Sequence, residues 1–405
     1  TIAPDIGDPR YTGVAFWDDA YGYNTERLGM AFVKAATRAG AEAANYVELT
    51  GFLMSGRDVT GVTATDKITG KSLTLAAKCT VINTGPWTRH TLSLLGEEVS
   101  SPDFRLALTL NLVLRRAVVT THAVGLPAYR EGWAKSRLYF FVPWRGRTMI
   151  GTHMTIYDGS PDAMKVSSDD VNSFISILNL AHPGAHITAA DVALVHAGLQ
   201  PAEDRAVAAG GEPQPLNHFR IVDHAESDGL NGLMTVVGVK YTTARDVAER
   251  TLARLAPRLG RSFASASSDA QPLPGGDFRD LDALVAEVEA AGFSPDVARH
   301  LACNYGTEYR DVVRLGAEDR ALLQPVGEGT MTLGAEVVHA VREEMAVTLA
   351  DVVLRRTDLG SAGLPDNAAL RRAAALMAGD LKWDEPRVAR EIEAVQLHYR
   401  RFSVP

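Results

Sequence analysis

Residues 232–252, GLMTVVGVKYTTARDVAERTL, join a buried strand to a helix through a polar turn that could bind an anion. The expected strand ends at Gly238, and Thr242 or Thr243 is placed to cap a helix over residues 243–255. Free backbone N–H groups and the positive end of the helix dipole would favour an anion, or a ring that becomes anionic on reduction. Spacing alone favours an ordinary strand-to-helix turn, so this segment by itself assigns no ligand.

The spacing of histidines and cysteines in this sequence gives little indication of a metal site. His182 and His186 stand four residues apart, but Pro183 and Gly184 interrupt the helix that would align them, so we predict no metal site. The chain has only two cysteines, which excludes a disulfide framework and a zinc site built on cysteines. This cysteine usage fits a reducing cytosol.

The elements that must position the turn form a mixed α/β pattern. Residues 24–40 predict an amphipathic helix, and residues 167–180 predict a surface helix. Residues 261–276, rich in Ser, Ala, Pro and Gly, are typical of a linker, and the pattern after them is helical. The expected strands are residues 44–49, 59–65 and 72–76 of a β-meander, a buried strand over 79–83, and sheet strands over 108–116, 137–144 and 147–154.

Composition sets the class of protein. The 405 residues are 46% hydrophobic and 22% charged, as in a folded soluble chain. Lys and Arg number 41 against 49 Asp and Glu, a net charge of −8, and no long basic cluster appears, so we expect no nucleic-acid partner. No run approaches the roughly 20 apolar residues of a membrane-spanning helix, and we expect no signal peptide. These features predict a cytoplasmic protein.

Five stretches in order resemble the FAD-dependent glycerol-3-phosphate dehydrogenases, which belong to the D-amino-acid-oxidase-like flavoenzymes. The segment Gly238-Val239-Lys240-Tyr241-Thr242-Thr243-Ala244-Arg245 is similar to the family's GGKxTTxR turn, which holds the pyrimidine edge of the flavin. The other four are Phe16-Trp17-Asp18-Asp19-Ala20 before a helix, Val81-Ile82-Asn83-Thr84-Gly85-Pro86-Trp87, the pair Phe141-Val142-Pro143-Trp144 and Ile150-Gly151-Thr152, and residues 335–360 with the Tyr305-Gly306-Thr307 turn before them.

The resemblance implies an incomplete α/β FAD-binding domain with an inserted antiparallel β-sheet substrate domain and a C-terminal all-α domain. The family begins with a βαβ unit bearing GxGxxG, which this sequence lacks, so we expect a family member without its first part. The implied division is residues 1–105 as the remainder of the FAD-binding domain, 106–225 as the substrate domain, 226–260 as the return to the FAD-binding domain, 261–280 as a linker and 281–405 as the helical domain.

The resemblance also implies the site. FAD would contact the two turns, at Thr84, Gly85, Pro86 and Trp87 and at Gly238, Lys240, Tyr241, Thr242 and Thr243. Lys240 is the catalytic candidate at the flavin edge, where its ammonium would stabilise the reduced ring, although packing of its stem over the sheet is the alternative. His153, just past a strand end, and His196, just before a Gly198-Leu199 turn, are candidates for the base that takes the hydroxyl proton, although a lone histidine is more often structural.

Three residues are the expected substrate contacts: Asn111, Thr152 and Gln200. Gln200 stands where the family has an arginine in a GxRP turn, and Asn111 stands where it often has a histidine; a second family arginine would fall near Asn217. Glutamine can hydrogen-bond an oxygen but lacks the charged fork that grips a phosphate. These departures leave the substrate open.

The predicted function is oxidation of sn-glycerol 3-phosphate to dihydroxyacetone phosphate by hydride transfer to FAD, with the electrons passed to a quinone or another acceptor. One alternative is a related FAD enzyme for another polyol phosphate or a hydroxy acid. Another is a non-catalytic partner subunit that has lost FAD, and a third is a site completed by a βαβ unit from a separate chain. The family analogy adds a peripheral contact with the inner membrane face, without a basic amphipathic helix to support it, and the helical domain could pack on a second subunit as a homo-oligomer.

Overall fold

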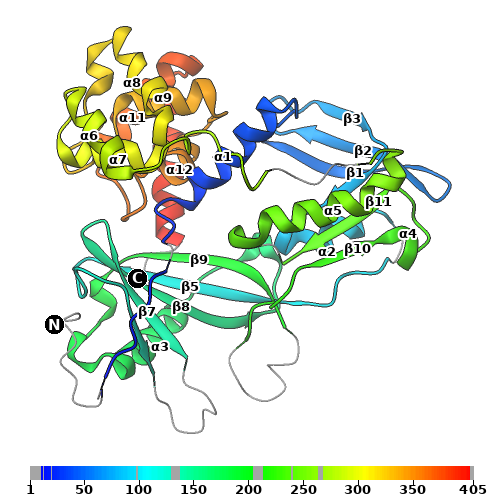
Figure 1. Ribbon diagram of the computed structural model, residues 1–405, viewed down its shortest axis with the longest axis horizontal. Helices are drawn as coiled ribbons and strands as arrows, with labels where there is room; N and C mark the ends of the chain where they lie inside the picture. Colours follow the sequence, from blue (N-terminus) through cyan, green and yellow to red (C-terminus); the bar gives the residue numbers. More distant parts are fainter. Residues whose placement is uncertain are drawn as a thin grey trace.

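The computed structural model describes residues 11, 13–19, 21–96, 99–128, 137–203, 213–238, 240–262 and 268–401. Ala20 and Val239, which belong to two of the family-like motifs, lie outside these residues, as do residues 263–267 of the expected linker. Figure 1 shows three parts: a small α/β part, a five-stranded sheet and a group of helices at the C-terminal end. The expected fold class is confirmed.

The α/β part is built from two stretches of the chain. Its small sheet has the order β10-β11-β4, in which β10 and β11 are antiparallel and β11 and β4 are parallel. Beside it lies the predicted β-meander, β1-β2-β3. The elements are α1 (Thr25–Arg38), β1 (Val47–Ser55), β2 (Asp58–Asp66), β3 (Ser72–Ala76), β4 (Thr80–Ile82), η1 (Gly85–Trp87), α2 (Thr88–Ser93), β10 (Arg220–Asp223), α4 (His224–Ser227), β11 (Leu233–Val237), η6 (Tyr241–Thr243) and α5 (Ala244–Leu259).

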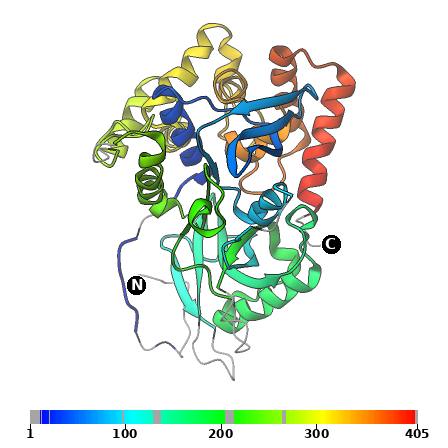
Figure 2. The ribbon, with the colours of Figure 1, turned by 90° about the vertical axis from the view of Figure 1, so that its right-hand side faces the viewer.

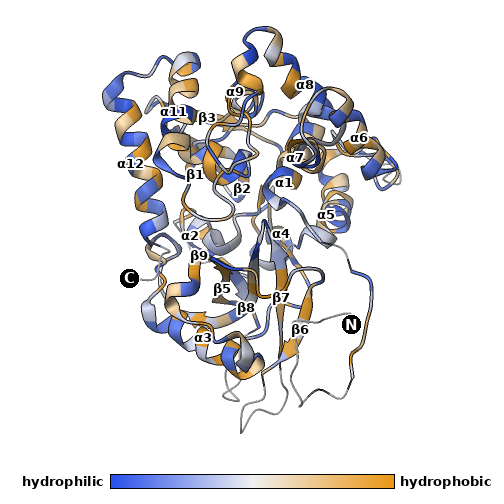
Figure 3. Cartoon of the chain, turned by 90° about the vertical axis from the view of Figure 1, so that its left-hand side faces the viewer, coloured by the Kyte–Doolittle hydropathy of each residue, from blue (hydrophilic) through white to orange (hydrophobic). Residues whose placement is uncertain are grey.

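The larger sheet is antiparallel, with the order β6-β7-β8-β5-β9. One face of this sheet packs on α3 (Figure 3). The apolar core between them includes Leu108, Leu110 and Leu112 of β5 with Phe174 and Leu178 of α3. The other face looks toward the two remaining parts (Figure 2). The elements are β5 (Arg105–Leu114), β6 (Val124–Pro127), β7 (Leu138–Trp144), β8 (Arg147–Tyr157), α3 (Ser168–Ala181) and β9 (Val192–Ala202).

The C-terminal part is helical, as its pattern predicts. Its core continues into the sheet, because Val113 of β5 and Leu194 of β9 pack among the apolar side chains of this part. The elements are α6 (Leu281–Ala290), α7 (Pro295–Tyr305), α8 (Tyr309–Arg314), α9 (Gly334–Glu343), α10 (Leu349–Asp351), the π-helical turn η10 (Val352–Arg356), α11 (Asn367–Leu381) and α12 (Glu385–Arg401).

Helix α1 joins the α/β part to the helical part through ion pairs. Arg27 is buried and pairs with the buried carboxylate of Glu344. Lys34 Nζ lies 2.5 Å from Glu308 Oε2 and 3.8 Å from Glu344 Oε1, and Arg38 also pairs with Glu308. Because each buried charge has a partner of opposite sign, the desolvation cost of this interface is offset.

Candidate active site

Two turns of the α/β part lie at the same edge of its sheet. Strands β4 and β11 run parallel, with Thr235 opposite Ile82. One strand is followed by Thr84 and the turn η1, and the other by Gly238 and the turn η6. Because neighbouring parallel strands end at one edge, the sheet brings together the two turns that the sequence predicts to hold a cofactor, in the usual place for a ligand in such a sheet.

The turn after β11 leaves the start of a helix open to a ligand. Gly238 has a φ of +83°, which a residue with a Cβ rarely adopts. Lys240 and Tyr241 are exposed. Thr243 occupies the N-cap position of the 16-residue helix α5, but its Oγ1 lies 3.3 Å from the carbonyl oxygen of Lys240, and no described side chain caps α5. The predicted threonine cap is therefore wrong, and backbone N–H groups at the start of α5 remain available to an acceptor.

The turn after β4 faces the larger sheet. Gly85 has a φ of +52° with open space beside its Cα, and Trp87 is 41% exposed. The Trp87 indole Nε1 donates to Asp162 Oδ1 at 2.9 Å, and the turn η1 also contacts β9. The turn after β4 therefore lies against the five-stranded sheet, and the candidate site includes the face of this sheet that lies opposite α3.

That face of the sheet carries a polar row, which we define as Thr109, Asn111, Thr152, His196 and Gln200. Thr152 Oγ1 donates to Asn111 Oδ1 at 3.1 Å, and Gln200 Nε2 donates to Thr109 Oγ1 at 2.8 Å. His196 of β9 is the register partner of Asn111 of β5. All three expected substrate contacts therefore lie on one surface, together with one of the two expected bases.

His153 lies elsewhere. Strand β8 continues to Tyr157, so the expectation that His153 follows a strand end is wrong. An extra residue, Thr152, interrupts the pairing of β5 with β8 and reverses the alternation of side chains beyond it. His153 consequently points to the α3 side, buried and stacked on Phe174 with ring centroids 5.0 Å apart. It does not reach the polar row.

His196 has the surroundings of a proton acceptor. The expectation of a turn after it is wrong, because residues 197–201 belong to β9. Its ring contacts the Trp144 indole edge to face, with centroids 6.5 Å apart. Loss of hydration to the surrounding protein lowers the pKa of His196, and the charge of Glu26 partly opposes this shift.

Several residues of this region were missed from the sequence. Glu26 and Trp144 lie around His196, and Thr109 completes the polar row. Arg137 and Gln200 approach the same atom, since Arg137 Nη2 and Gln200 Nε2 each lie 3.4 Å from Met154 Sδ. The alternation of β5 could have indicated Thr109, and Trp144 ends the family-like motif Phe141-Val142-Pro143-Trp144, whereas Glu26 and Arg137 had no local signal.

Comparison with known proteins agrees with this geometry. The family model described as FAD dependent oxidoreductase matches residues 1–245, and the model described as the C-terminal domain of alpha-glycerophosphate oxidase matches residues 266–388. A glycerol-3-phosphate dehydrogenase of Synechocystis is 32% identical over 357 residues, which are 85% of this chain and 63% of that protein. The chain belongs to the family of FAD-dependent oxidoreductases.

Two further glycerol-3-phosphate dehydrogenases are similar to this chain. The mitochondrial glycerol-3-phosphate dehydrogenase of Bos taurus is 27% identical over 92% of this chain and 51% of its own length. The crystal structure of the Bacillus halodurans glycerol-3-phosphate dehydrogenase, complexed with FAD, superposes with a TM-score of 0.75 at 25% identity, covering 93% of this chain and 73% of that one. The chain thus spans about half to two thirds of the length of the curated relatives named here.

The residues present fit the flavin of this family. The uncapped start of α5 offers donors to a ring carbonyl, and the turns at Gly85 and Gly238 leave backbone free of side chains. Within the described ranges, no group of three or more His, Cys, Asp or Glu side chains is arranged to hold a metal ion. None of the described helices is both long and apolar enough to cross a lipid bilayer.

Proposed function

We propose that the protein, with FAD bound, oxidises sn-glycerol 3-phosphate to dihydroxyacetone phosphate. The observation that carries this proposal is the polar row, which lies on the sheet face opposite α3, while the turn after β4 contacts strand β9 of the same sheet. Bound FAD would supply a two-electron acceptor for the hydride that leaves C2 of the substrate. The chain's own residues must bind the substrate and take its hydroxyl proton.

His196 is the proposed base. Its lowered pKa keeps the imidazole neutral at neutral pH, so a ring nitrogen can accept the proton as the C2 carbonyl forms. Lys240, exposed in the turn after β11, is the proposed cation at the flavin edge, where its ammonium would favour added negative charge.

The polar row supplies the proposed substrate contacts. Asn111 and Thr152 are already joined to each other, and together with Gln200 they present amide and hydroxyl groups to a substrate that carries hydroxyls. Arg137, which approaches Met154 beside Gln200, is the proposed source of positive charge for the phosphate. This arrangement would replace the arginine that the family has at the position of Gln200.

A second candidate is oxidation of another polyol phosphate or of a hydroxy acid. It is favoured by the uncharged side chains at 111 and 200, because a substrate without a phosphate group needs no arginine there. Neither function identifies the electron acceptor, so a quinone remains a prediction. The peripheral contact with the inner membrane face, the cytoplasmic location, the homo-oligomer and the division into domains also remain predictions.

Anaerobic reduction of the flavin tests the proposal. The FAD-bound protein is mixed with sn-glycerol 3-phosphate, with other polyol phosphates, with 2-hydroxy acids and with glycerol, and the loss of oxidised flavin absorbance is followed. We expect fast bleaching with sn-glycerol 3-phosphate and an equal amount of dihydroxyacetone phosphate. Fast bleaching by another compound alone would select the second candidate. A protein that retains no FAD when isolated would support the non-catalytic partner subunit.

A further inference from the structure

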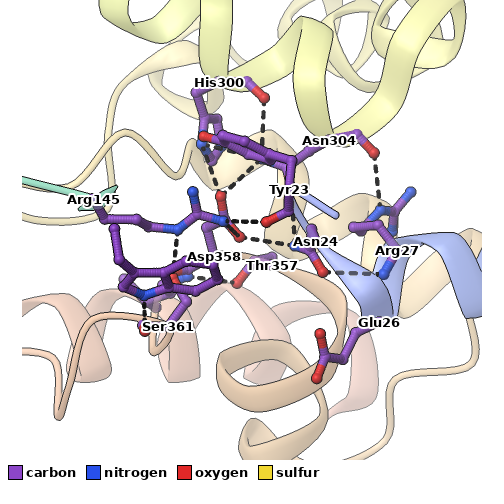
Figure 4. Close-up of polar contacts among 12 residues, drawn as sticks. Tyr23, Asn24, Glu26, Arg27, Arg145, His300, Asn304, Thr357, Asp358 and Ser361 are labelled. Atoms are coloured by element: carbon purple, nitrogen blue, oxygen red, sulfur yellow. Dashed lines mark hydrogen bonds and ion pairs between the residues drawn. The ribbon is translucent and has the colours of Figure 1, made fainter. Parts of the chain in front are cut away.

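The carboxylate of Asp358 lies where segments from all three parts of the molecule meet (Figure 4). Its Oδ1 accepts from Asn24 Nδ2 and from Arg145 Nη2, both at 2.8 Å. Its Oδ2 accepts from Asn304 Nδ2 at 3.0 Å and lies 3.6 Å from His300 Nδ1. The Asp358 side chain is 7% exposed, so these partners replace nearly all of its hydration.

One set of contacts leads from Asp358 to helix α1. Asn24 caps this helix, because its Oδ1 accepts from the Arg27 backbone N–H at 3.1 Å. The first turn of α1 carries Glu26, whose charge acts on His196 and on Tyr241 of the turn after β11. The position of Asn24 therefore sets where Glu26 lies relative to the site.

A second set of contacts leads from Asp358 to the five-stranded sheet. Arg145, between β7 and β8, also donates to Ser361 Oγ at 2.8 Å and to the Tyr23 carbonyl at 3.0 Å. Its guanidinium lies 4.7 Å from the ring of Trp144, whose Nε1 donates to the Ser361 carbonyl at 2.9 Å. Because the Trp144 ring contacts His196, this set ends at the proposed base.

We propose that Asp358 is a positioning residue through which the C-terminal helical part holds His196 of the sheet in register with Glu26 and the turn after β11. One set of contacts leads through Asn24 to the first turn of α1, which carries Glu26, and the other leads through Arg145 and Trp144 to the His196 ring. The inference rests on the proposed role of His196. It means that the helical part contributes to the site although it does not line it. A shift of about 1 Å at a reacting group can cost about 100-fold in rate.

Asp358→Asn tests the proposal, because it keeps the shape of the side chain and removes its charge. We measure kcat and KM on the FAD-bound protein and the titration of His196 by histidine-labelled NMR, assigned with His196→Gln. We expect a kcat lower by about 10- to 100-fold, a KM changed less than threefold, and a His196 pKa closer to its ordinary value. Asp282→Asn is the matched control, since Asp282 is exposed in the same helical part and pairs only at 3.4 Å with Arg299.

Ser361→Ala keeps the test decisive if Asp358→Asn does not fold. It removes the hydroxyl that holds Arg145 Nε and leaves the carboxylate in place, so we expect a smaller change of the same kind. A folded variant with the parental kcat and the parental His196 titration would overturn the proposal. The titration of His196 does not depend on turnover. If the parent protein did not oxidise sn-glycerol 3-phosphate, the proposed function would be wrong, and the titration would still test the positioning role of Asp358.

Discussion

Thr152 and Asn111 come from neighbouring strands and meet on one face of the sheet, with Thr152 Oγ1 3.1 Å from Asn111 Oδ1. They meet because Thr152 is the extra residue in the pairing of β8 with β5. The same bulge brings the backbone of Gly151 against the Asn111 side chain: a Cβ at 151 would lie 1.6 Å from Asn111 Oδ1. The polar row therefore depends on a glycine that itself touches no substrate.

Gly151→Ala should destabilise the protein by about 1–3 kcal/mol, because the methyl group must displace the Asn111 amide or the strand. Denaturant unfolding measures the change. The double variant Gly151→Ala with Asn111→Ala should recover most of the stability, since the clash disappears. It should recover none of the substrate affinity, since the Asn111 amide is also lost. Gly198→Ala on β9 is the stability control, because a Cβ there meets no atom within 4 Å. Equal unfolding midpoints for Gly151→Ala and the control would contradict the prediction.

His196→Gln should lower kcat by about 100- to 10,000-fold, the usual loss when a general base is removed. In the parent protein, the lowered pKa of His196 means that kcat/KM should stay high below pH 6.5 and fall only as the pH drops through that lower pKa. A pH profile of kcat/KM on the FAD-bound protein checks both statements. If kcat/KM of His196→Gln still fell at low pH as it does in the parent protein, the base would be another group.

Arg137→Gln should raise KM for a phosphorylated substrate by about 10- to 100-fold with little change in kcat, because one charged hydrogen-bonding partner of the phosphate is lost. Adding Gln200→Arg should restore part of the affinity, since both side chains approach Met154. Arg314→Gln, an exposed arginine paired with Asp311 at 3.3 Å, serves as the control for loss of one positive charge. A parental KM in Arg137→Gln would remove Arg137 from the site.

Glu344→Gln should cost about 3–5 kcal/mol of stability, because it leaves Arg27 buried without its charged partner. Burial alone would raise the pKa of Glu344, but His339, whose Nε2 lies 3.3 Å from Glu344 Oε1, and the charge of Arg27 lower it from 4.5 to about 2. A lowered pKa stabilises the fold above the unfolded value of 4.5, and this contribution is lost as the pH falls from there toward 2. The parent and the variant should therefore converge in acid.

Urea unfolding at about pH 7 and about pH 3.5 measures this convergence. Glu318→Gln is the matched control, since its carboxylate is 57% exposed and pairs with Arg342 on the surface. We expect the control to change stability by less than about 1 kcal/mol at either pH. A Glu344→Gln variant as stable as the control would show that the helix α1 interface does not depend on this pair.

The sequence predicts elements well where hydrophobic periodicity is regular. Helix α1 begins directly after Asn24, at the start of the predicted helix, and β2, β3, β7 and α5 lie within a few residues of their expected positions. Strand β9 escaped prediction because Gly198 and Pro201 interrupt its pattern. The sheet tolerates this proline because β9 is an edge strand.

The site shows where sequence reasoning stops. Asn111, Thr152 and Gln200, each predicted separately as a substrate contact, lie in three strands of one sheet, although Gln200 was expected in a turn. His153 was misplaced because a single extra residue reverses the alternation of a strand, and a bulge leaves little trace in composition. The hydrogen-bonding partners of Asp358 lie 54 to 334 residues away from it in the sequence, so no local pattern indicates them.

The ion pairs of α1 also limit which segments of the chain can be exchanged between related proteins. Arg27, Lys34 and Arg38 lie on a helix that precedes the β-meander, yet their acidic partners all belong to the C-terminal helices. A chimera cut at the linker near residue 261 would separate these cations from the carboxylates that neutralise them. A helical module transplanted from this protein therefore has to include residues 25–38, so the unit that exchanges intact is discontinuous in the chain.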